Sequence, residues 1–506
     1  MQFTTHKSFC KVLVFFSLLA LFCLIPLYNA EFPDLTTNSF LAEQLIGCTT
    51  GIACGAVTPD GRPLLWKTRD VGNGNQEYHY VDDGRIPFIG LCYSNENGFR
   101  YYAGVNAAGF AVENSNSYNL PEGGGGWDAF GNMQAHMLAT CRTVDDLEHL
   151  LDSTNRTGRS FNYNYGTFDA FGDAAMFEAA CSSYVRIDAA ETQEGFIVRS
   201  NYSYSGDALD NRARNWGPNR HDRAYALYRH AIENEELTPK YIFQKVARNL
   251  AAEGMDDYTL PYDNYYEDLP FGMIPLDGTI CRSTSRSVMV AQGILPNERP
   301  DLTTLWGMVG NPVGCIASPM WVRAGSVPVE YDGPNGSEIC DHSMDISDWI
   351  TKTQNFETCI ESWKLHNTEG NGIWDWSFAI ESNIFDRVES YFQSDNFSLD
   401  MLENFQMLLA RQVSDSLENW LPPYYEVEVF EPIFWDNHVL IYWTPPEEMD
   451  LGPEIRYLPR YNVFRSSEPF PNDNQGELIA HTTETIFSDL DPPNGFAFYR
   501  VEAISQ

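Results

Sequence analysis

The chain has 506 residues, which is long for a single hydrophobic core and predicts two or three folded units. An apolar fraction of 43% is enough for packed globular domains. The formal net charge of −38, from 32 basic and 70 acidic residues, argues against a nucleic acid or an anionic membrane as partner, because such partners require basic surfaces.

The first thirty residues have the layout of a secretory signal peptide. Lys7 and Lys11 precede an apolar run from Val12 to Leu27, and Ala30 offers a small residue before a cleavage site. The run is short for a membrane span, and no second candidate follows it. We therefore expect residues 1–30 to be a signal peptide and the protein to be secreted or periplasmic, without a membrane anchor.

Beyond residue 47, groups of strands alternate with groups of helices. Two apolar runs flank an Asp60-Gly61 turn and predict a hairpin that begins near Cys48. Further strands are expected over 88–93, 99–106, 109–114, 166–170, 175–178, 184–187 and 195–201, and helices over 128–139, 143–151, 220–233 and 238–252. Thr143 and Thr238 are good N-caps. This order is not strict βαβ alternation, so it favours an α+β fold with antiparallel sheets layered against helices.

The last third of the chain changes character at a Pro422-Pro423 break. Before it, we expect a polar strand over 279–290, a strand and turn over 306–316, and mainly helix over 347–420. After it the pattern consists of short strands only, over 439–443, 461–465, 485–489 and 496–503. With Trp443 as a core residue, residues 421–506 resemble a fibronectin type III module, a small all-β sandwich.

The cysteines permit disulfides but do not suggest a metal site. Nine of the eleven remain after the signal peptide, and without Cys48 the remainder is eight. An even number in an exported protein is compatible with disulfides. No Cys-x-x-Cys pair and no cluster of histidines is present, so we expect no zinc site, and no metal or other cofactor.

Cys48 itself has two interpretations. It is either an ordinary half-cystine or core residue, or a nucleophile that becomes the first residue of the mature chain. Residues 31–47 are too short to fold alone and form either a docked terminus or a propeptide. Scission at Gly47–Cys48, where glycine lets the backbone bend, would free an α-amino group. That amine and the thiol titrate close together, near pH 8, and can exchange a proton without a histidine.

Six short motifs occur in order along the chain: Cys48-Thr49-Thr50, Asp60-Gly61, Trp66-Lys67-Thr68-Arg69-Asp70, Ala103-Gly104-Val105-Asn106-Ala107-Ala108-Gly109-Phe110, Arg199-Ser200-Asn201-Tyr202 and Ser285-Arg286-Ser287-Val288. Together they resemble the N-terminal-nucleophile hydrolases, in the branch of acyl-CoA:6-aminopenicillanic acid acyltransferase-like, linear amide C–N hydrolases, whose cousins are choloylglycine hydrolases and cysteine dipeptidases. The resemblance covers roughly residues 48–317. It implies a four-layer αββα sandwich, which we assign to residues 48–420.

The resemblance also implies catalytic roles. Cys48 is the expected nucleophile, and Asp70 matches the aspartate that holds its amine. Asn201 matches an asparagine that donates to the oxyanion. Arg286 matches an arginine that either lowers the thiol pKa or holds a substrate carboxylate. The alternatives are a strand-end acid for Asp70, a turn residue for Asn201 and a surface ion pair for Arg286.

Three further positions are candidates through the same resemblance. Asn116 has the spacing of a second oxyanion asparagine, with Asn114 as its competitor. Lys67 stands where choloylglycine hydrolases carry an arginine that approaches the sulfur. We expect Asn114 and Lys67 to contact substrate if they are not catalytic.

The resulting hypothesis is an exported, autoproteolytic amidohydrolase that cleaves linear amides through an acyl-thioester on Cys48. The alternatives are a cysteine dipeptidase or an acyltransferase of the same superfamily, and an exported binding or adhesion protein whose active site has lapsed. The expected partner is a small-molecule or peptide amide. Its identity and the oligomeric state remain open.

Overall fold

The computed structural model describes residues 47–94, 100–121, 126, 132–208, 217–251, 254–264, 266–267, 269, 272–354, 357–367, 370–394, 397–420, 433–435, 438–442, 460–466, 477–482, 486–489 and 498–504. Residues 1–46 form one unit of the chain and Gly47–Gln506 another. The predicted signal peptide and nearly all of the predicted propeptide therefore lie outside the described residues, as does Trp443.

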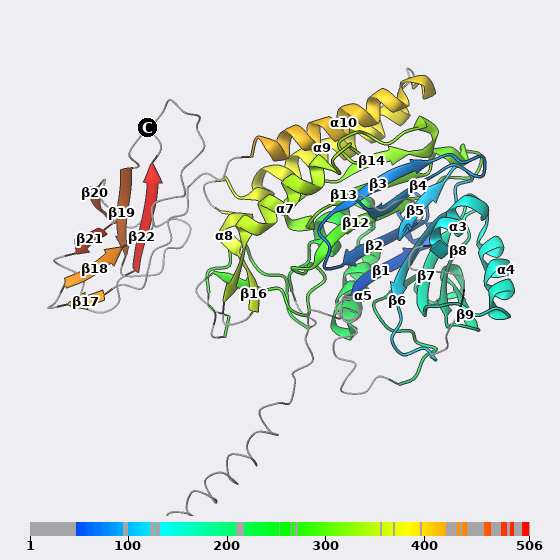
Figure 1. The fold of residues 1–506 in the computed structure, drawn as a ribbon, viewed down its shortest axis with the longest axis horizontal. Coiled ribbons are helices and arrows are strands. Elements are labelled where there is room, and N and C mark those ends of the chain that lie inside the picture. The colour runs from blue at the N-terminus through cyan, green and yellow to red at the C-terminus, as the bar shows by residue number, and fades with distance from the viewer. Residues whose placement is uncertain are drawn as a thin grey trace, which may run out of the picture. The chain divides into compact units, whose positions relative to one another are not determined.

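Two antiparallel sheets form the centre of the second unit (Figure 1). The first has the order β10-β1-β2-β12-β13-β14, with bounds Phe196–Arg199, Cys48–Ala53, Leu64–Asp70, Ser285–Gln292, Thr304–Val309 and Ser318–Trp321. The second is a meander from β3 to β9, with bounds Gln76–Val81, Phe88–Tyr93, Ala103–Asn106, Ala111–Asn116, Tyr163–Phe168, Ala174–Ala179 and Tyr184–Asp188. In the first sheet, strands distant in sequence become neighbours.

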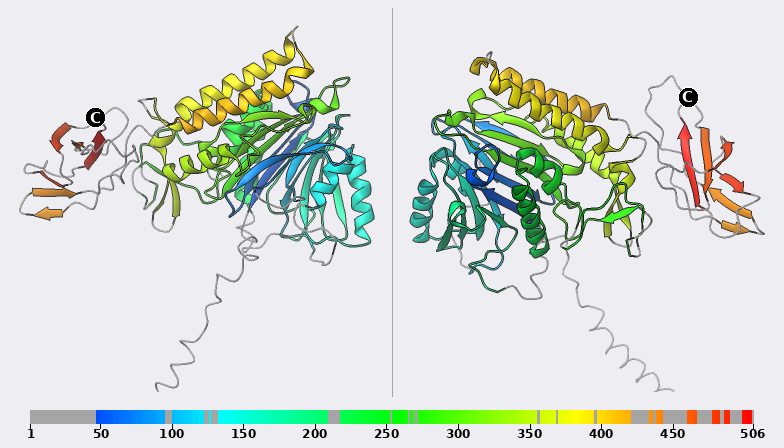
Figure 2. Two further views of the ribbon diagram at one scale, coloured as in Figure 1. Left: turned by 45° about the horizontal axis from the view of Figure 1, so that its top comes forward. Right: turned by 180° about the vertical axis from the view of Figure 1, so that it is seen from behind.

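Helices cover the outer face of each sheet (Figures 1 and 2). Helices α3 (Asn132–Thr140) and α4 (Val144–Asn155) pack on the meander, while β1 and β2 pack on β6 and β7. The other sheet is covered by α5 (Pro218–Glu233), the π-helix η4 (Ile242–Ala247), α7 (Glu338–Ile350), α9 (Ile373–Gln393) and α10 (Leu402–Glu418). The expectation of an α+β fold with antiparallel sheets is confirmed, and the layers follow the order helix, sheet, sheet, helix.

Smaller elements complete this unit. Strands β11 (Met273–Pro275), β16 (Glu357–Glu361) and β15 (Thr351–Gln354) form a three-stranded sheet. Short helices are α6 (Pro239–Tyr241) and α8 (Ser362–Leu365). Single 3-10 turns are η1 (Gly55–Val57), η2 (Ala189–Glu191), η5 (Pro300–Leu302), η6 (Pro312–Gly314), η7 (Val322–Ala324) and η8 (Leu399–Met401).

Period-2 alternation assigns side chains of the meander to two cores. Along β4, Ile89 and Leu91 belong to the large core, which also contains β1, β2 and β12, whereas Phe88 and Cys92 belong to the core beneath α3 and α4. The same alternation points Gln76 and Tyr78 of β3 toward the facing sheet and leaves Glu77 and His79 on the other face. Both faces of the meander are therefore covered.

Most sequence-predicted elements are confirmed. The hairpin around Asp60-Gly61 is present as β1 and β2, with Cys48 paired to Arg69. Thr143 caps α4 in a capping box with Asp146. Thr238 caps α6 by accepting from the amide of Tyr241.

Two expectations are wrong. The strand predicted from Thr279 begins at Ser285, because the Thr279 hydroxyl bonds local carbonyls, those of Leu276 and Cys281, and holds a turn. The helix predicted to end at residue 252 ends at Ala247. The segment predicted as mainly helix, 347–420, is confirmed through α9 and α10, although it also contains β15 and β16.

The C-terminal region has strands where they were predicted. Its described strands form two three-stranded antiparallel sheets, β17-β18-β21 (Ile433–Trp435, His438–Tyr442 and Ile486–Asp489) and β20-β19-β22 (Glu477–Thr482, Arg460–Ser466 and Phe498–Ile504). Val439, Ile441, Val463 and Val501 form a small core. The fibronectin-like sandwich itself stays a prediction. Across the described ranges, no helix carries an apolar stretch that could span a bilayer.

Candidate active site

The peptide bond between Gly47 and Cys48 is held on both sides. The amide of Asp70 donates to the Gly47 carbonyl at 2.9 Å, and the amide of Cys48 donates to Asn201 Oδ1 at 2.8 Å. Antiparallel pairing explains the meeting, because β1 starts where β2 and β10 end. The structure therefore brings together three of the sequence-predicted residues, Cys48, Asp70 and Asn201.

Arg220 is a fourth residue at this bond, and it was not predicted. Its side chain is 2% exposed, and Nη1 donates to the Cys48 carbonyl at 2.7 Å and to Thr49 Oγ1 at 2.8 Å. Nη2 donates to Asn201 Oδ1 at 2.9 Å. Arg220 lies in the first turn of α5, where the helix dipole disfavours a cation. A basic residue at the start of a predicted helix is the sequence signal that could have identified Arg220 as a functional candidate.

Gly47 is required by space. A Cβ at this position would lie 2.5 Å from Arg220 Nη2 and 2.9 Å from Asn201 Oδ1. No side chain fits without moving those two groups. The sequence argument attributed this glycine to backbone freedom, whereas the structure gives close approach as the reason.

Asp70 is fully buried but incompletely bonded. Ser285 Oγ donates to Oδ1 at 2.7 Å, while Nη1 of Arg220 and Nη1 of Arg282 each lie 3.7 Å from Oδ2. Within the described residues, Oδ2 accepts no hydrogen bond. Burial raises the pKa of Asp70 above its ordinary value, although Arg282 and Arg220 oppose the shift. Arg282 was also missed by the sequence argument.

Asn201 uses both ends of its side chain. Oδ1 accepts from Cys48 and Arg220, and Nδ2 donates to the Asn116 carbonyl at 3.0 Å. Asn116 is half-buried, and its side chain bonds Tyr118, whose pKa burial raises to about 12. The Nδ2 donor is thus engaged with the backbone of Asn116. The oxyanion roles of Asn201 and Asn116 stay predictions.

Asn114 and Lys67 form a buried pair. Lys67 is 2% exposed and donates to Asn114 Oδ1 at 2.6 Å and also to the Asn114 carbonyl. Burial lowers the pKa of Lys67, and the nearby Cys48 and Glu113 oppose that shift. Burial also raises the pKa of Glu113 to about 7. Both predicted substrate-contacting residues are committed to each other, and their contact with substrate stays a prediction.

Arg286 is turned toward its own backbone. Its Nη1 donates to the carbonyls of Ser283 at 2.5 Å and Ser285 at 3.1 Å. Burial lowers its pKa, while Asp348 and Asp70 oppose the shift. Among the described contacts, Arg282 rather than Arg286 reaches Asp70. The role predicted for Arg286 stays a prediction.

Cations dominate the field around Cys48. Lys67, Arg69 and Arg220 each interact electrostatically with its thiol. Arg69 is fixed between two rings, 4.3 Å from the centroid of Tyr93 and 3.8 Å from that of Tyr102. Such a field favours negative charge that develops on a bound carbonyl oxygen. None of the nine cysteines in the described residues forms a disulfide.

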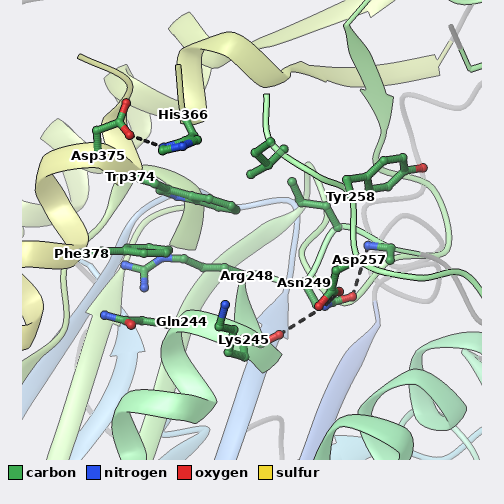
Figure 3. Close-up of a pocket in the computed structure, with 13 residues that line it drawn as sticks. Gln244, Lys245, Arg248, Asn249, Asp257, Tyr258, His366, Trp374, Asp375 and Phe378 are labelled. Atoms are coloured by element: carbon green, nitrogen blue, oxygen red, sulfur yellow. Dashed lines mark hydrogen bonds and ion pairs between the residues drawn. The ribbon is translucent and has the colours of Figure 1, made fainter. Parts of the chain in front are cut away.

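A hollow of about 410 Å³ lies between η4 and α9, and none of Cys48, Asp70 or Asn201 lines it (Figure 3). Two of its polar side chains form ion pairs within the protein: His366 pairs with Asp375, and Arg248 pairs with Glu381. Trp374 stacks on Phe378 with ring centroids 5.2 Å apart. The arrangement is that of a packing junction, and we assign the chemistry to the surroundings of Cys48.

Neither a family model nor a curated protein sequence matches the chain. Among solved structures, conjugated bile acid hydrolase from Clostridium perfringens is 10% identical, with a TM-score of 0.33 over 52% of this chain and 89% of that one. Penicillin V acylase from Agrobacterium tumefaciens is 13% identical, with a TM-score of 0.33 over 54% and 85%. The Caenorhabditis elegans ortholog of N-acylethanolamine-hydrolyzing acid amidase is 13% identical, with a TM-score of 0.32 over 52% and 99%. Likeness at this level carries no argument, so the interpretation rests on the geometry.

Proposed function

We propose that the chain is an N-terminal-nucleophile amidohydrolase that cuts its own Gly47–Cys48 bond and then cleaves linear amide C–N bonds through Cys48. The observation that carries the proposal is the clamp on that peptide bond. Its carbonyl oxygen accepts from Asp70, its nitrogen donates to Asn201, and the next carbonyl accepts from Arg220. The end of a strand needs only backbone hydrogen bonds, so the buried side chains of Arg220 and Asn201 at this peptide bond support a chemical role.

Self-cleavage uses the atoms already in place. The Cys48 sulfur attacks the Gly47 carbonyl carbon, and the amide of Asp70 stabilises the oxygen as it becomes negative, a type of contact worth about 3–4 kcal/mol of barrier. The C–N bond breaks, and the thiol proton ends on the nitrogen of Cys48. Water then hydrolyses the thioester, which leaves a carboxylate on Gly47 and restores the thiol.

Turnover repeats the same chemistry on an external amide. Once Gly47 has left, the amide of Asp70 is available to the carbonyl oxygen of a substrate. The new α-amino group of Cys48 remains beside Asn201 Oδ1 and takes the thiol proton as the sulfur attacks. It returns that proton to the leaving amine, and water releases the acyl group. No histidine is needed.

We further infer that residues 1–30 direct export and are removed, that a propeptide, 31–47, is also removed, and that residues 421–506 form a fibronectin type III-like sandwich. The sequence pattern of the first thirty residues supports export. Two short antiparallel sheets with a valine and isoleucine core support the sandwich.

Trapping the acyl-enzyme tests the activity. Processed protein is mixed with a panel of linear amides, quenched in acid and digested, and the Cys48 peptide is weighed. We expect an acyl adduct on Cys48 with at least one amide, and the same adduct in Cys54→Ser, whose buried thiol is a matched control. Amide turnover with no adduct on Cys48 under rapid quenching would refute the mechanism.

A further inference from the structure

A mixed group of potential metal ligands lies on the face of the meander opposite to Gln76. Glu77 of β3 and Cys92 of β4 are directly paired across the strands, and His79 follows on the same face as Glu77. The ligand atoms of these three residues lie within 4.8 Å of one another. One imidazole, one carboxylate and one thiol thus converge on a common point.

The imidazole is already oriented for such a site. His79 Nε2 lies 2.6 Å from Glu77 Oε1 and 3.6 Å from Asp332 Oδ1. On the other side of the ring, Nδ1 lies 3.5 Å from the hydroxyl of Tyr101. A second partner that fixes the distal ring nitrogen is a regular feature of histidine ligands.

The charges of the surrounding carboxylates favour a cation here, and the proposed ligands are largely shielded from solvent. Glu77 is 4% and Cys92 2% exposed, whereas the side chain of Asp332 is 40% exposed and leaves a route from solvent. Two carboxylates face a single imidazole.

We propose that Glu77, His79 and Cys92 bind one divalent transition-metal ion, with Zn²⁺ as the best match and Asp332 or water as the fourth ligand. Mixed S, N and O ligands suit zinc, whereas Mg²⁺ and Ca²⁺ take oxygen alone. The expectation of no zinc rested on missing local motifs, and this group forms only through strand pairing. The site does not depend on the proposed hydrolase activity. Gln76, the neighbour of Glu77 in sequence, points to the opposite face, where it accepts a hydrogen bond from Arg69.

Metal titration of the full chain without an affinity tag tests the proposal. After treatment with a chelator, Zn²⁺ is titrated against a chromophoric indicator, and Co²⁺ is added to a second sample for absorption spectra. We expect one Zn²⁺ per chain, and a thiolate-to-cobalt charge-transfer band together with the strong visible bands of four-coordinate Co²⁺. Zn²⁺ should also raise the thermal unfolding temperature.

Two variants and a matched control make the test specific. Cys92→Ser should lose the charge-transfer band, and both Cys92→Ser and His79→Ala should weaken Zn²⁺ binding by about tenfold or more. Cys141→Ser, which alters another thiol that is 2% exposed in the same core, should bind as the parent does. Parent protein with no stoichiometric binding, or His79→Ala and Cys92→Ser with unchanged affinity, would overturn the proposal.

Discussion

Two buried arginine–carboxylate pairs in this molecule differ in how completely their members are bonded. Arg248 and Glu381 are joined by two hydrogen bonds of 2.9 Å, and both side chains are 0% exposed. The remaining donors and acceptors are also used: Arg248 bonds the carbonyls of Pro312 and Cys315, and Glu381 accepts from the amide of Ala317. This pair ties η4 to η6 and α9.

Arg220 and Asp70 are as deeply buried, but their closest atoms are 3.7 Å apart. Arg220 donates instead to Cys48, Thr49 and Asn201. An ion pair that only holds a fold is expected to satisfy its own members, because unsatisfied buried charge is costly. The open pair therefore indicates a site where groups are kept available for another partner.

The largest effect is expected from replacing Cys48, whose carbonyl accepts a hydrogen bond from Arg220. Cys48→Ala should keep residues before Cys48 attached and abolish amide turnover, because both the attacking sulfur and the scission that frees the amine are lost. Intact mass and amide hydrolysis measure the two effects. Cys54→Ala, with a buried thiol that takes no part, should be cut and active. Turnover in Cys48→Ala would show that the residues around Arg220 and Asp70 are not the catalytic site.

Arg220→Lys should follow in size. Lysine keeps the charge but cannot reproduce the fork of donors, so scission and turnover should each fall by about 10²-fold with little change in thermal stability. Rate constants for scission and for amide hydrolysis, measured beside the melting temperature, check this. A variant that loses stability but keeps both rates would show that Arg220 is only a brace.

Arg248→Met should show the reverse pattern. Removing one member of the closed pair leaves Glu381 buried and uncompensated, so we expect a loss of about 3–5 kcal/mol in the free energy of unfolding. Turnover per folded molecule should be unchanged, because Arg248 touches nothing at Cys48. Denaturant unfolding and active-site titration separate the two quantities. Reduced turnover in fully folded Arg248→Met protein would erase the distinction between the pairs.

The buried side chain of Glu113, which lies near Lys67, should make the stability of the protein depend on pH. Burial raises its pKa from 4.5 to about 7, so the folded chain keeps a proton that the unfolded chain has released. The free energy of unfolding should therefore fall as pH rises from 4.5 to 7, by roughly 3 kcal/mol in total. Glu113→Gln should flatten that part of the stability profile. Parallel profiles for the two proteins would contradict the shift.

Local signals predicted the hairpin around Asp60-Gly61 and the caps at Thr143 and Thr238, because a turn or a cap is decided by a few adjacent residues. Strand pairing then brings Cys48, Asp70 and Asn201 together, and the roles that the resemblance implied for them stay predictions. Among the described residues, the long helices α9 and α10 precede residue 420 and strands follow it, as the sequence pattern predicted.

The parts that escaped prediction depend on contacts between distant segments. Arg220 reaches a residue 172 positions away, and no motif surrounds it. Glu77 and Cys92 are 15 positions apart and meet only through the register of β3 and β4. Strand β3 itself was missed because most of its side chains are polar or tyrosine, so it lacks the apolar run that marks the other strands. Such features follow from the assembled fold rather than from local pattern.

The most direct test of the account is the identity of the first residue in the purified, active protein. Intact mass and N-terminal sequencing should show a chain that begins at Cys48 with a free α-amino group. Active protein that still carries residues ahead of Cys48 would contradict the central claim, because the proton acceptor on which the mechanism depends would then be an ordinary peptide nitrogen.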